Sequence, residues 1–183
     1  MKRLQRDAVI LSLVENLKNK GSWCGETHIQ KAIYFIQELF GVPLEFEFIV
    51  YKHGPLSYDL SDELTAMRAD MLLRLQLQPR PYGPSLVPGK GSVLIKTHFP
   101  KTIRKYNPQV KFVANNFRNM GVTELERLAT ALFVTQEFDP EGSIESRTQW
   151  IIGLKPHIKL NKARDAVNAV DEIIEKSREI KKA

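Results

Sequence analysis

The side chains with the greatest capacity for chemistry near the start of this sequence are a cysteine and two histidines. Cys24 and His28 are four residues apart, a spacing that places both on one face of a helix, with Glu26 between them and His53 further along. Thiolate, imidazole and carboxylate groups bind Zn²⁺ when several of them converge. Such a site normally draws on a second pair of ligands, and the sequence has none. We therefore expect no metal site.

The remaining histidines and the cysteine have simpler interpretations. His98 and His157 each stand alone in the sequence, and Cys24 follows Trp23 directly. A lone cysteine beside an aromatic residue is expected to pack as a small apolar side chain rather than to act as a nucleophile. We read the isolated histidines as ordinary surface or core residues.

Phosphate-binding glycine motifs are also absent. Neither G-x-x-x-x-G-K-[ST] nor G-x-G-x-x-G occurs, and the glycines around Lys90 precede no predicted helix. Paired acids such as Asp62-Glu63 and Asp171-Glu172 fall on polar faces of predicted helices, where they are expected to be solvated. The sequence therefore predicts no catalytic residue, no cofactor and no metal.

Charge is distributed unevenly along the chain, whose net charge is +6. The segment from Met71 to Val122 contains no Asp or Glu and nine Lys or Arg residues. Such a segment produces a positive field that attracts phosphate backbones or acidic proteins. The residues that we expect to contact phosphate or an acidic partner are Arg80, Lys90, Lys96, Lys101, Arg104 and Lys105.

One short stretch joins a predicted strand to a predicted helix and forms a candidate recognition surface. Apolar residues alternate over 46–50, which predicts a strand, and Gly54-Pro55 then predicts a tight turn. Ser57 and Asp59 favour a helix start. The candidate partner-binding residues are Tyr51, Lys52, His53, Tyr58 and Tyr82. Aromatic and basic side chains on a rigid loop make strong protein contacts, although the turn has a simpler interpretation, in which it only aims the following helix.

The spacing of apolar residues predicts a mostly helical α+β protein. Helices are expected over about 6–20, 27–40, 58–70, 107–120, 123–138, 143–154 and 160–182, about seven in all. Strands are expected over 46–50, 73–77 and 93–95, giving a small antiparallel sheet and a β-wing with a proline-rich loop. We expect a single domain over 1–183, with a winged-helix-like core at 1–98 and a helical part at 107–182 packed on it.

Composition places the chain in the cytoplasm. Apolar residues make up 43% and charged residues 26%, as in soluble globular proteins, and the single cysteine suits a reducing compartment. No apolar run is long enough to cross a bilayer, and no signal-peptide cleavage site follows the basic start. We expect no membrane association.

The stretch that joins the predicted strand to the predicted helix also carries a family resemblance. Residues 51–57, Tyr-Lys-His-Gly-Pro-Leu-Ser, and the helical run Ile-Gln-Lys-Ala-Ile-Tyr-Phe at 29–35 resemble the paired signature of the Panacea, or SocA/YwgA-like, antitoxin-associated domains. The resemblance covers residues 5 to 100. It implies a small bacterial or phage domain that binds a protein, as an antitoxin or a protease adaptor, and it implies no catalytic residues.

Three functions follow as hypotheses. The first is a non-enzymatic protein-binding module that neutralises a toxin or recruits a protease or defence component. The second is a winged-helix nucleic-acid-binding regulator, and the third is an enzyme whose active site no motif reveals. The predicted helix 58–70 carries four acids and only one arginine, which suits a DNA recognition helix poorly. We therefore expect any nucleic-acid binding to be weak.

Overall fold

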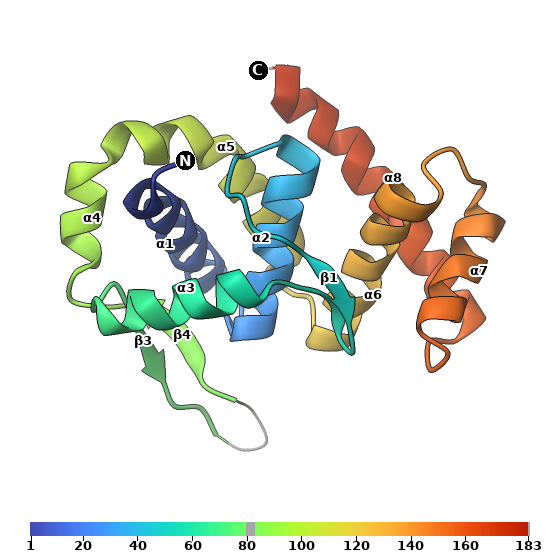
Figure 1. The fold of residues 1–183 in the computed structure, drawn as a ribbon, viewed down its shortest axis with the longest axis horizontal. Helices are drawn as coiled ribbons and strands as arrows, with labels where there is room; N and C mark the ends of the chain where they lie inside the picture. Colours follow the sequence, from blue (N-terminus) through green and yellow to red (C-terminus); the bar gives the residue numbers. More distant parts are fainter. Residues whose placement is uncertain (80–82, 183) are drawn as a thin grey trace. The chain divides into compact units, whose positions relative to one another are not determined.

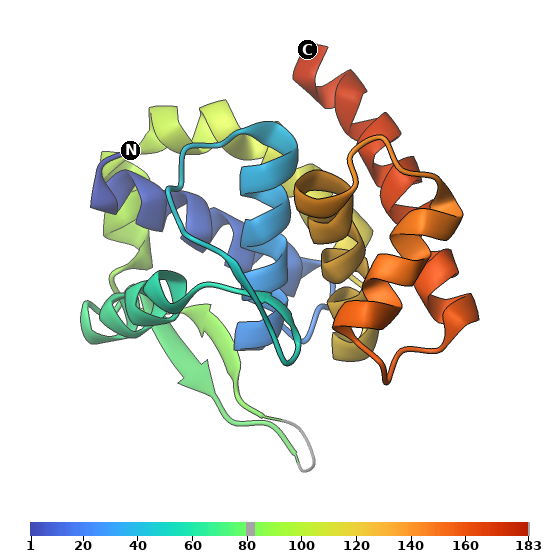
Figure 2. The same cartoon turned by 45° about the vertical axis from the view of Figure 1, so that its right-hand side comes forward.

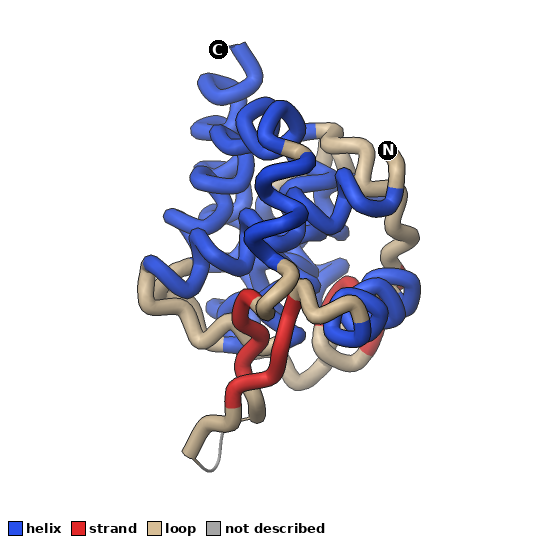
Figure 3. The backbone as a smooth tube through the Cα atoms, turned by 90° about the vertical axis from the view of Figure 1, so that its left-hand side faces the viewer, coloured by secondary structure: helices blue, strands red, loops and turns tan. Residues whose placement is uncertain are grey.

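The structure is a computed structural model that describes residues 1–79 and 83–182 (Figure 1). The described part contains eight α-helices, one π-helical segment and two separate pairs of antiparallel strands. Figure 3 shows the short strands in red among the blue helices. The predicted class, α+β with helix predominant, is confirmed, with eight helices in place of about seven. Arg80 and Tyr82 lie outside the described residues.

The chain forms two compact units. The first comprises residues 1–48 and 57–120, and the second comprises residues 49–56 together with the chain from Gly121 onward. The second unit thus takes a short segment from the N-terminal half of the chain. Residues 107–120, which we had grouped with the C-terminal part, belong to the first unit.

Helix α1 (Arg3–Asn19) lies at the centre of the first unit, where α2 (Glu26–Phe40), α4 (Ser92–His98), α5 (Pro100–Phe117) and β4 (Ser85–Pro88) pack around it. The spacing of its apolar residues is typical of a helix with one buried and one polar face. Residues 7–14 are instead all buried, because neighbours cover the helix on several sides. Part of the remaining core is aromatic: the rings of Phe35 and Phe117 meet edge to face, with their centroids 4.8 Å apart.

Helix α3 (Tyr58–Ala69) begins as the sequence predicts. The Oγ of Ser57 accepts a hydrogen bond from the backbone N–H of Leu60 at 3.2 Å, which caps the helix. Gln30 on α2 holds the same cap through two bonds to the Ser57 backbone, at 2.9 and 3.1 Å. The start of α3 is therefore fixed to α2 by a buried side chain.

The strand predicted over 46–50 is wrong in position. Strand β1 is Ile49–Tyr51, and it pairs with β2, Gly54–Leu56, in antiparallel register. Gln37 bonds both the N–H and the C=O of Phe46, at 3.0 and 2.9 Å, and so occupies the groups that a partner strand would need. Gly54 has a φ of +82°, as expected for glycine at this joint, but it belongs to β2 and the turn lies at Lys52 and His53.

The strand predicted over 93–95 is also wrong, because that segment forms α4. Strand β3 (Leu73–Gln76) pairs instead with β4, with Leu75 opposite Leu86. After β4 the chain turns back, and the N–H of Gly91 donates to the carbonyl of Met71 at 2.9 Å. This contact starts a helix where the apolar run alone indicated a strand.

Helix α5 begins earlier than predicted. We expected a helix start at Asn107-Pro108, but α5 begins at Pro100 and contains Pro108 in its interior. Proline is favoured in the first turn of a helix because it lacks the N–H that would be unpaired there. Both prolines carry that local signal, and packing of α5 along α1 selects the first one.

The second unit contains the β1–β2 hairpin, α6 (Val122–Phe133), a π-helical segment (Val134–Phe138), α7 (Ile144–Leu154) and α8 (Leu160–Lys182). Figure 2 shows α7 lying beside α8. Arg147 on α7 and Asp171 on α8 form a two-pronged ion pair, with nitrogen to oxygen distances of 2.6 and 2.7 Å. The hairpin packs against α6 through β2.

Candidate functional site

The structure brings three of the predicted partner-binding residues together. Tyr51 ends β1, Lys52 and His53 form the hairpin turn, and all three side chains are exposed. Tyr58, at the start of α3, is 58% exposed but belongs to the first unit, whereas the hairpin belongs to the second. Tyr82 lies outside the described residues. The hairpin turn is thus the part of the predicted surface that the structure assembles.

The predicted basic contacts lie in the first unit, on α4, α5 and the connection before α4. Lys90, Lys101, Arg104 and Lys105 are exposed. Lys96 is less available, because its Nζ pairs with the carboxylate of Glu15 at 2.8 Å. The structure thus reduces the set of free cations by one, and Arg80 lies outside the described residues.

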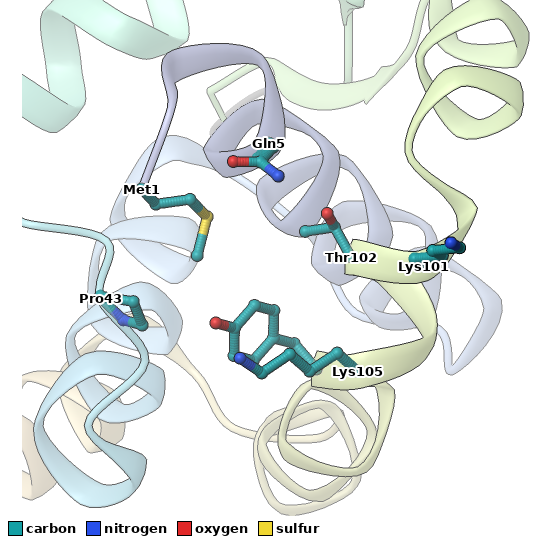
Figure 4. A pocket seen from close by; sticks show the side chains of 7 residues that line it. Met1, Gln5, Pro43, Lys101, Thr102 and Lys105 are labelled. Atoms are coloured by element: carbon teal, nitrogen blue, oxygen red, sulfur yellow. The ribbon is translucent and has the colours of Figure 1, made fainter.

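Two of these lysines line an open pocket of about 320 Å³ in the first unit (Figure 4). Lys101, Thr102 and Lys105 come from α5, while Met1 and Gln5 come from the start of the chain. Pro43 and Tyr106 complete the lining, and no acid takes part in it. The charge distribution indicated the lysines, but nothing in the sequence pointed to Met1 or Gln5 as their neighbours.

Exposed apolar side chains accompany the basic ones. Among the described residues from Met71 to Leu94, five large apolar side chains are exposed to solvent: Met71, Leu75, Leu77, Val93 and Leu94. Alternation along β3 puts Leu73 and Leu75 on one face, and Leu77 follows the end of the strand. Leu73 is buried, whereas Leu75 is half-exposed and Leu77 is 88% exposed, so apolar residues continue from the core into solvent along this segment. We refer to these five residues as the exposed apolar set.

A second open pocket, of about 530 Å³, lies entirely within the second unit. The hairpin turn contributes Lys52 and His53, and the end of α7 with the following turn contributes Leu154, Lys155 and His157. Helix α6 contributes Val122, Thr123 and Glu126. These three stretches are far apart in the sequence, so only the fold brings them together.

Lys155 fastens the hairpin turn to the end of α7. Its buried ammonium group donates to the carbonyl of Tyr51 and, at 2.8 Å, to that of Lys52. Burial lowers the pKa of Lys155, and the nearby carboxylate of Glu126 partly opposes this. Lys155 therefore positions Lys52 and His53 beside the pocket.

Glu126 is the buried acid of this pocket. Its side chain is 7% exposed, and its two oxygens lie 3.4 Å from His157 Nε2 and 3.6 Å from His53 Nδ1. The oxygen nearest His157 has no hydrogen-bond donor. The spacing of Thr123 and Glu126 resembles a capping box, but the residue before the helix is Gly121 and no side chain caps it. Glu126 is therefore free to face the pocket.

No protein-family model matches this chain, and no curated protein matches it. Function is therefore inferred from the chemistry of the side chains. The pocket of the first unit is cationic and contains no acid, whereas the pocket of the second unit combines cations with one buried carboxylate. The two pockets thus favour different ligands.

Cys24 and His28 are packed into the core. Burial raises the pKa of Cys24 to about 12, so the thiol stays protonated near neutral pH. The buried ring of His28 contacts the carbonyl of Met120 through Nε2 at 2.9 Å. Among the residues that the structure describes, no group of three or more His, Cys, Asp or Glu side chains has the arrangement of a metal site.

One further buried acid lies in the first unit. Asp7 on α1 is fully buried, neither of its oxygens has a hydrogen-bond partner, and its nearest cation is Arg3 at 3.9 Å. Burial, followed by repulsion from Glu63, raises the pKa of Asp7 to about 7. Burial also opposes ionisation of Glu63, but hydrogen bonds from Arg3 and Arg6 outweigh it and hold that pKa below its ordinary value. This cluster lines neither of the two pockets.

Proposed function

We propose that this chain is a non-enzymatic module that binds an acidic partner protein through the segment from Met71 to Val122. The observation that carries the proposal is that the exposed apolar set lies within the segment that has no acidic residue. A protein interface typically has an apolar centre and a charged rim. The exposed apolar set supplies the first feature and Lys90, Lys101, Arg104 and Lys105 supply the second.

The exposed apolar set favours a protein partner over nucleic acid. Leu77, Val93 and Leu94 gain little from a solvated phosphate backbone, whereas burial against a protein removes their apolar surface from water. Helix α3 adds a second argument, because Asp59, Asp62 and Asp70 border or lie on it and repel phosphates. Nucleic-acid binding by a winged-helix surface is therefore the second candidate.

The family resemblance supports a protein partner, and the hairpin turn offers further candidate contacts outside this segment. Exposed Tyr51, Lys52, His53 and Tyr58 are residue types that form strong contacts at protein interfaces. Resemblance to the Panacea domains favours an antitoxin-like or adaptor-like role in the bacterial or phage cytoplasm, with a toxin, a protease or a defence component as partner. None of the described helices is long and apolar enough to cross a membrane.

The test starts from the partner and ends with matched variants. The full-length chain is crosslinked in cells, the partner is identified by mass spectrometry, and its affinity is measured with purified proteins. Leu77→Asp and Leu94→Asp are each expected to weaken binding by about tenfold or more, because each places a charge in an apolar contact. Leu160→Asp, at a half-exposed leucine of the second unit, is the control and should bind normally.

Two outcomes would contradict the proposal. In one, both aspartate variants bind the partner as tightly as the original chain. In the other, the isolated protein binds a particular duplex DNA sequence tightly at about 0.15 M salt, which would favour the winged-helix alternative.

A further inference from the structure

The pocket around Glu126 carries an inference that does not depend on the exposed apolar set. It lies within the second unit, outside the segment from Met71 to Leu94 that holds the exposed apolar set. Its lining combines groups that attract anions with one buried carboxylate that repels most of them. A ligand that fits the pocket has to satisfy both features.

The anion-attracting groups come from three elements. Helix α6 has twelve residues and begins at the pocket with Val122 and Thr123. The first amides of a helix have no acceptor within the helix and lie at the positive end of its dipole, and Gly121 has no side chain to cap them. Lys52, His53 and His157 are exposed and add side-chain donors. Together these groups have the character of an oxyanion site.

Glu126 restricts which oxyanion is accepted. Its mostly buried side chain lines the open pocket, and the oxygen that lies 3.4 Å from His157 Nε2 has no hydrogen-bond donor. A buried acceptor of this kind is costly unless a ligand donates to it. Sulfate carries no proton near neutral pH, so it has no donor for the Glu126 carboxylate and would only be repelled by that group. Inorganic phosphate still carries a P–OH group at pH 7, whereas a phosphate monoester loses its last acidic proton at a pKa of about 6.

We infer that this pocket binds a protonated phosphate group. The P–OH donates to the Glu126 carboxylate, and the charged oxygens accept from the first turn of α6 and from Lys52 and His157. Lys155 acts as a positioning residue, because its bonds to the turn carbonyls hold Lys52 and His53 beside the pocket. Recognition thus depends on a proton that phosphate has and sulfate lacks.

The test compares the two anions on the full-length chain. Inorganic phosphate and sulfate are titrated separately by calorimetry at pH 7 and constant ionic strength. We expect phosphate to bind at least about tenfold more tightly than sulfate, the value of one hydrogen bond to a buried charged group. Methyl phosphate, which at pH 7 has largely lost its P–OH proton, is titrated as well: it is expected to bind more weakly than inorganic phosphate, and equal binding would contradict recognition through the proton.

Two variants separate recognition from folding. Glu126→Gln places an amide that can donate to sulfate, so the preference for phosphate is expected to fall to about twofold or less. His157→Ala removes an exposed ring and should weaken both anions without changing the melting temperature. Lys181→Gln, at an exposed lysine near the end of α8 that does not line the pocket, is the control and should leave both affinities unchanged.

Three further results would overturn the inference. They are equal affinity for phosphate and sulfate in the original chain, a phosphate preference that survives in a folded Glu126→Gln variant, and no saturable phosphate binding. The His157→Ala titration keeps the inference testable if Glu126→Gln does not fold, because unchanged phosphate binding in that variant would also contradict it.

Discussion

Asp7 and Glu126 are both buried acids, but their surroundings differ in a way that assigns them different roles. Asp7 lies on a central helix with two unpaired oxygens and lines neither pocket, so its ionisation affects mainly stability. Glu126 lines an open pocket, so a ligand bound there lies beside its carboxylate. The same chemical group is therefore a stability determinant in one unit and a candidate recognition residue in the other.

Asp7→Asn should stabilise the protein at alkaline pH. The pKa of Asp7 in the fold, about 7, lies above its ordinary value of 3.8, so the folded state favours the protonated form. Ionisation then makes folding less favourable as pH rises between these two values. We expect the variant to melt at a higher temperature than the original chain at pH 8 and at nearly the same temperature at pH 4.

The control for this prediction is Asp59→Asn, because Asp59 is exposed in the first turn of α3. The Asp59→Asn substitution should not raise the melting temperature more at pH 8 than at pH 4. A melting temperature for Asp7→Asn that shows the same difference from the original chain at both pH values would contradict the raised pKa.

Gly54→Val should destabilise the β1–β2 hairpin. Gly54 has a φ of +82°, where a β-branched side chain is strained, and we expect a loss of about 1–3 kcal/mol in the free energy of unfolding. Thermal or denaturant unfolding measures the loss. Gly153→Val on α7 is the control, since its site is open and helical, and a loss equal in both variants would argue against strain at Gly54.

At the scale of the elements, the ends of helices and strands depended on contacts that the sequence does not display. Pro100 and Pro108 are both acceptable helix starts, and packing along α1 selected Pro100. Gln37 removed residues 46–48 from any strand by bonding the backbone of Phe46. In contrast, the Ser57 cap of α3 involves residues three apart and was predicted correctly.

The ion pair between α7 and α8 gives a prediction at this scale. Arg147 is mostly buried and binds both oxygens of Asp171, so Arg147→Ala should reduce the free energy of unfolding by about 1–3 kcal/mol. Arg178→Ala breaks the exposed pair with Glu175 on α8 and should cost about 0.5 kcal/mol or less. Urea unfolding of both variants measures the difference, and equal losses would show that the buried pair is no stronger than the exposed one.

At the scale of the whole molecule, the uneven charge predicts how binding depends on salt. If the partner is an acidic protein, Gln substitution of Lys90, Lys101 and Lys105 should slow association and leave dissociation nearly unchanged. Tyr51→Ala or Tyr58→Ala should cost about 2 kcal/mol where the tyrosine lies at the centre of an interface. Stopped-flow kinetics at two salt concentrations distinguish these effects.

Nucleic acid would give the opposite pattern. The same triple substitution would weaken binding to duplex DNA and reduce the slope of log affinity against log salt by about one for each lost phosphate contact. We expect only weak, sequence-independent binding of this kind. A steep slope with tight binding at about 0.15 M salt would contradict the protein-partner proposal.

The sequence by itself determined the features that depend on neighbours along the chain. The apolar spacing of α2, α3 and α6, the cap at Ser57 and the segment without acids are all local properties, and local periodicity is what encodes a helix. Strand positions were less predictable, because a strand is completed by a partner elsewhere in the chain.

Only the tertiary structure decided which distant residues meet. It joined the β1–β2 hairpin to the helices that follow Gly121, and it placed His53 and His157 on opposite oxygens of Glu126. Within its own segment each residue looks ordinary: His53 lies in a turn, His157 lies in a loop, and Glu126 has the spacing of a helix cap. Their convergence is set by packing and by the bonds of Lys155 to the hairpin turn, which no periodicity in the sequence records.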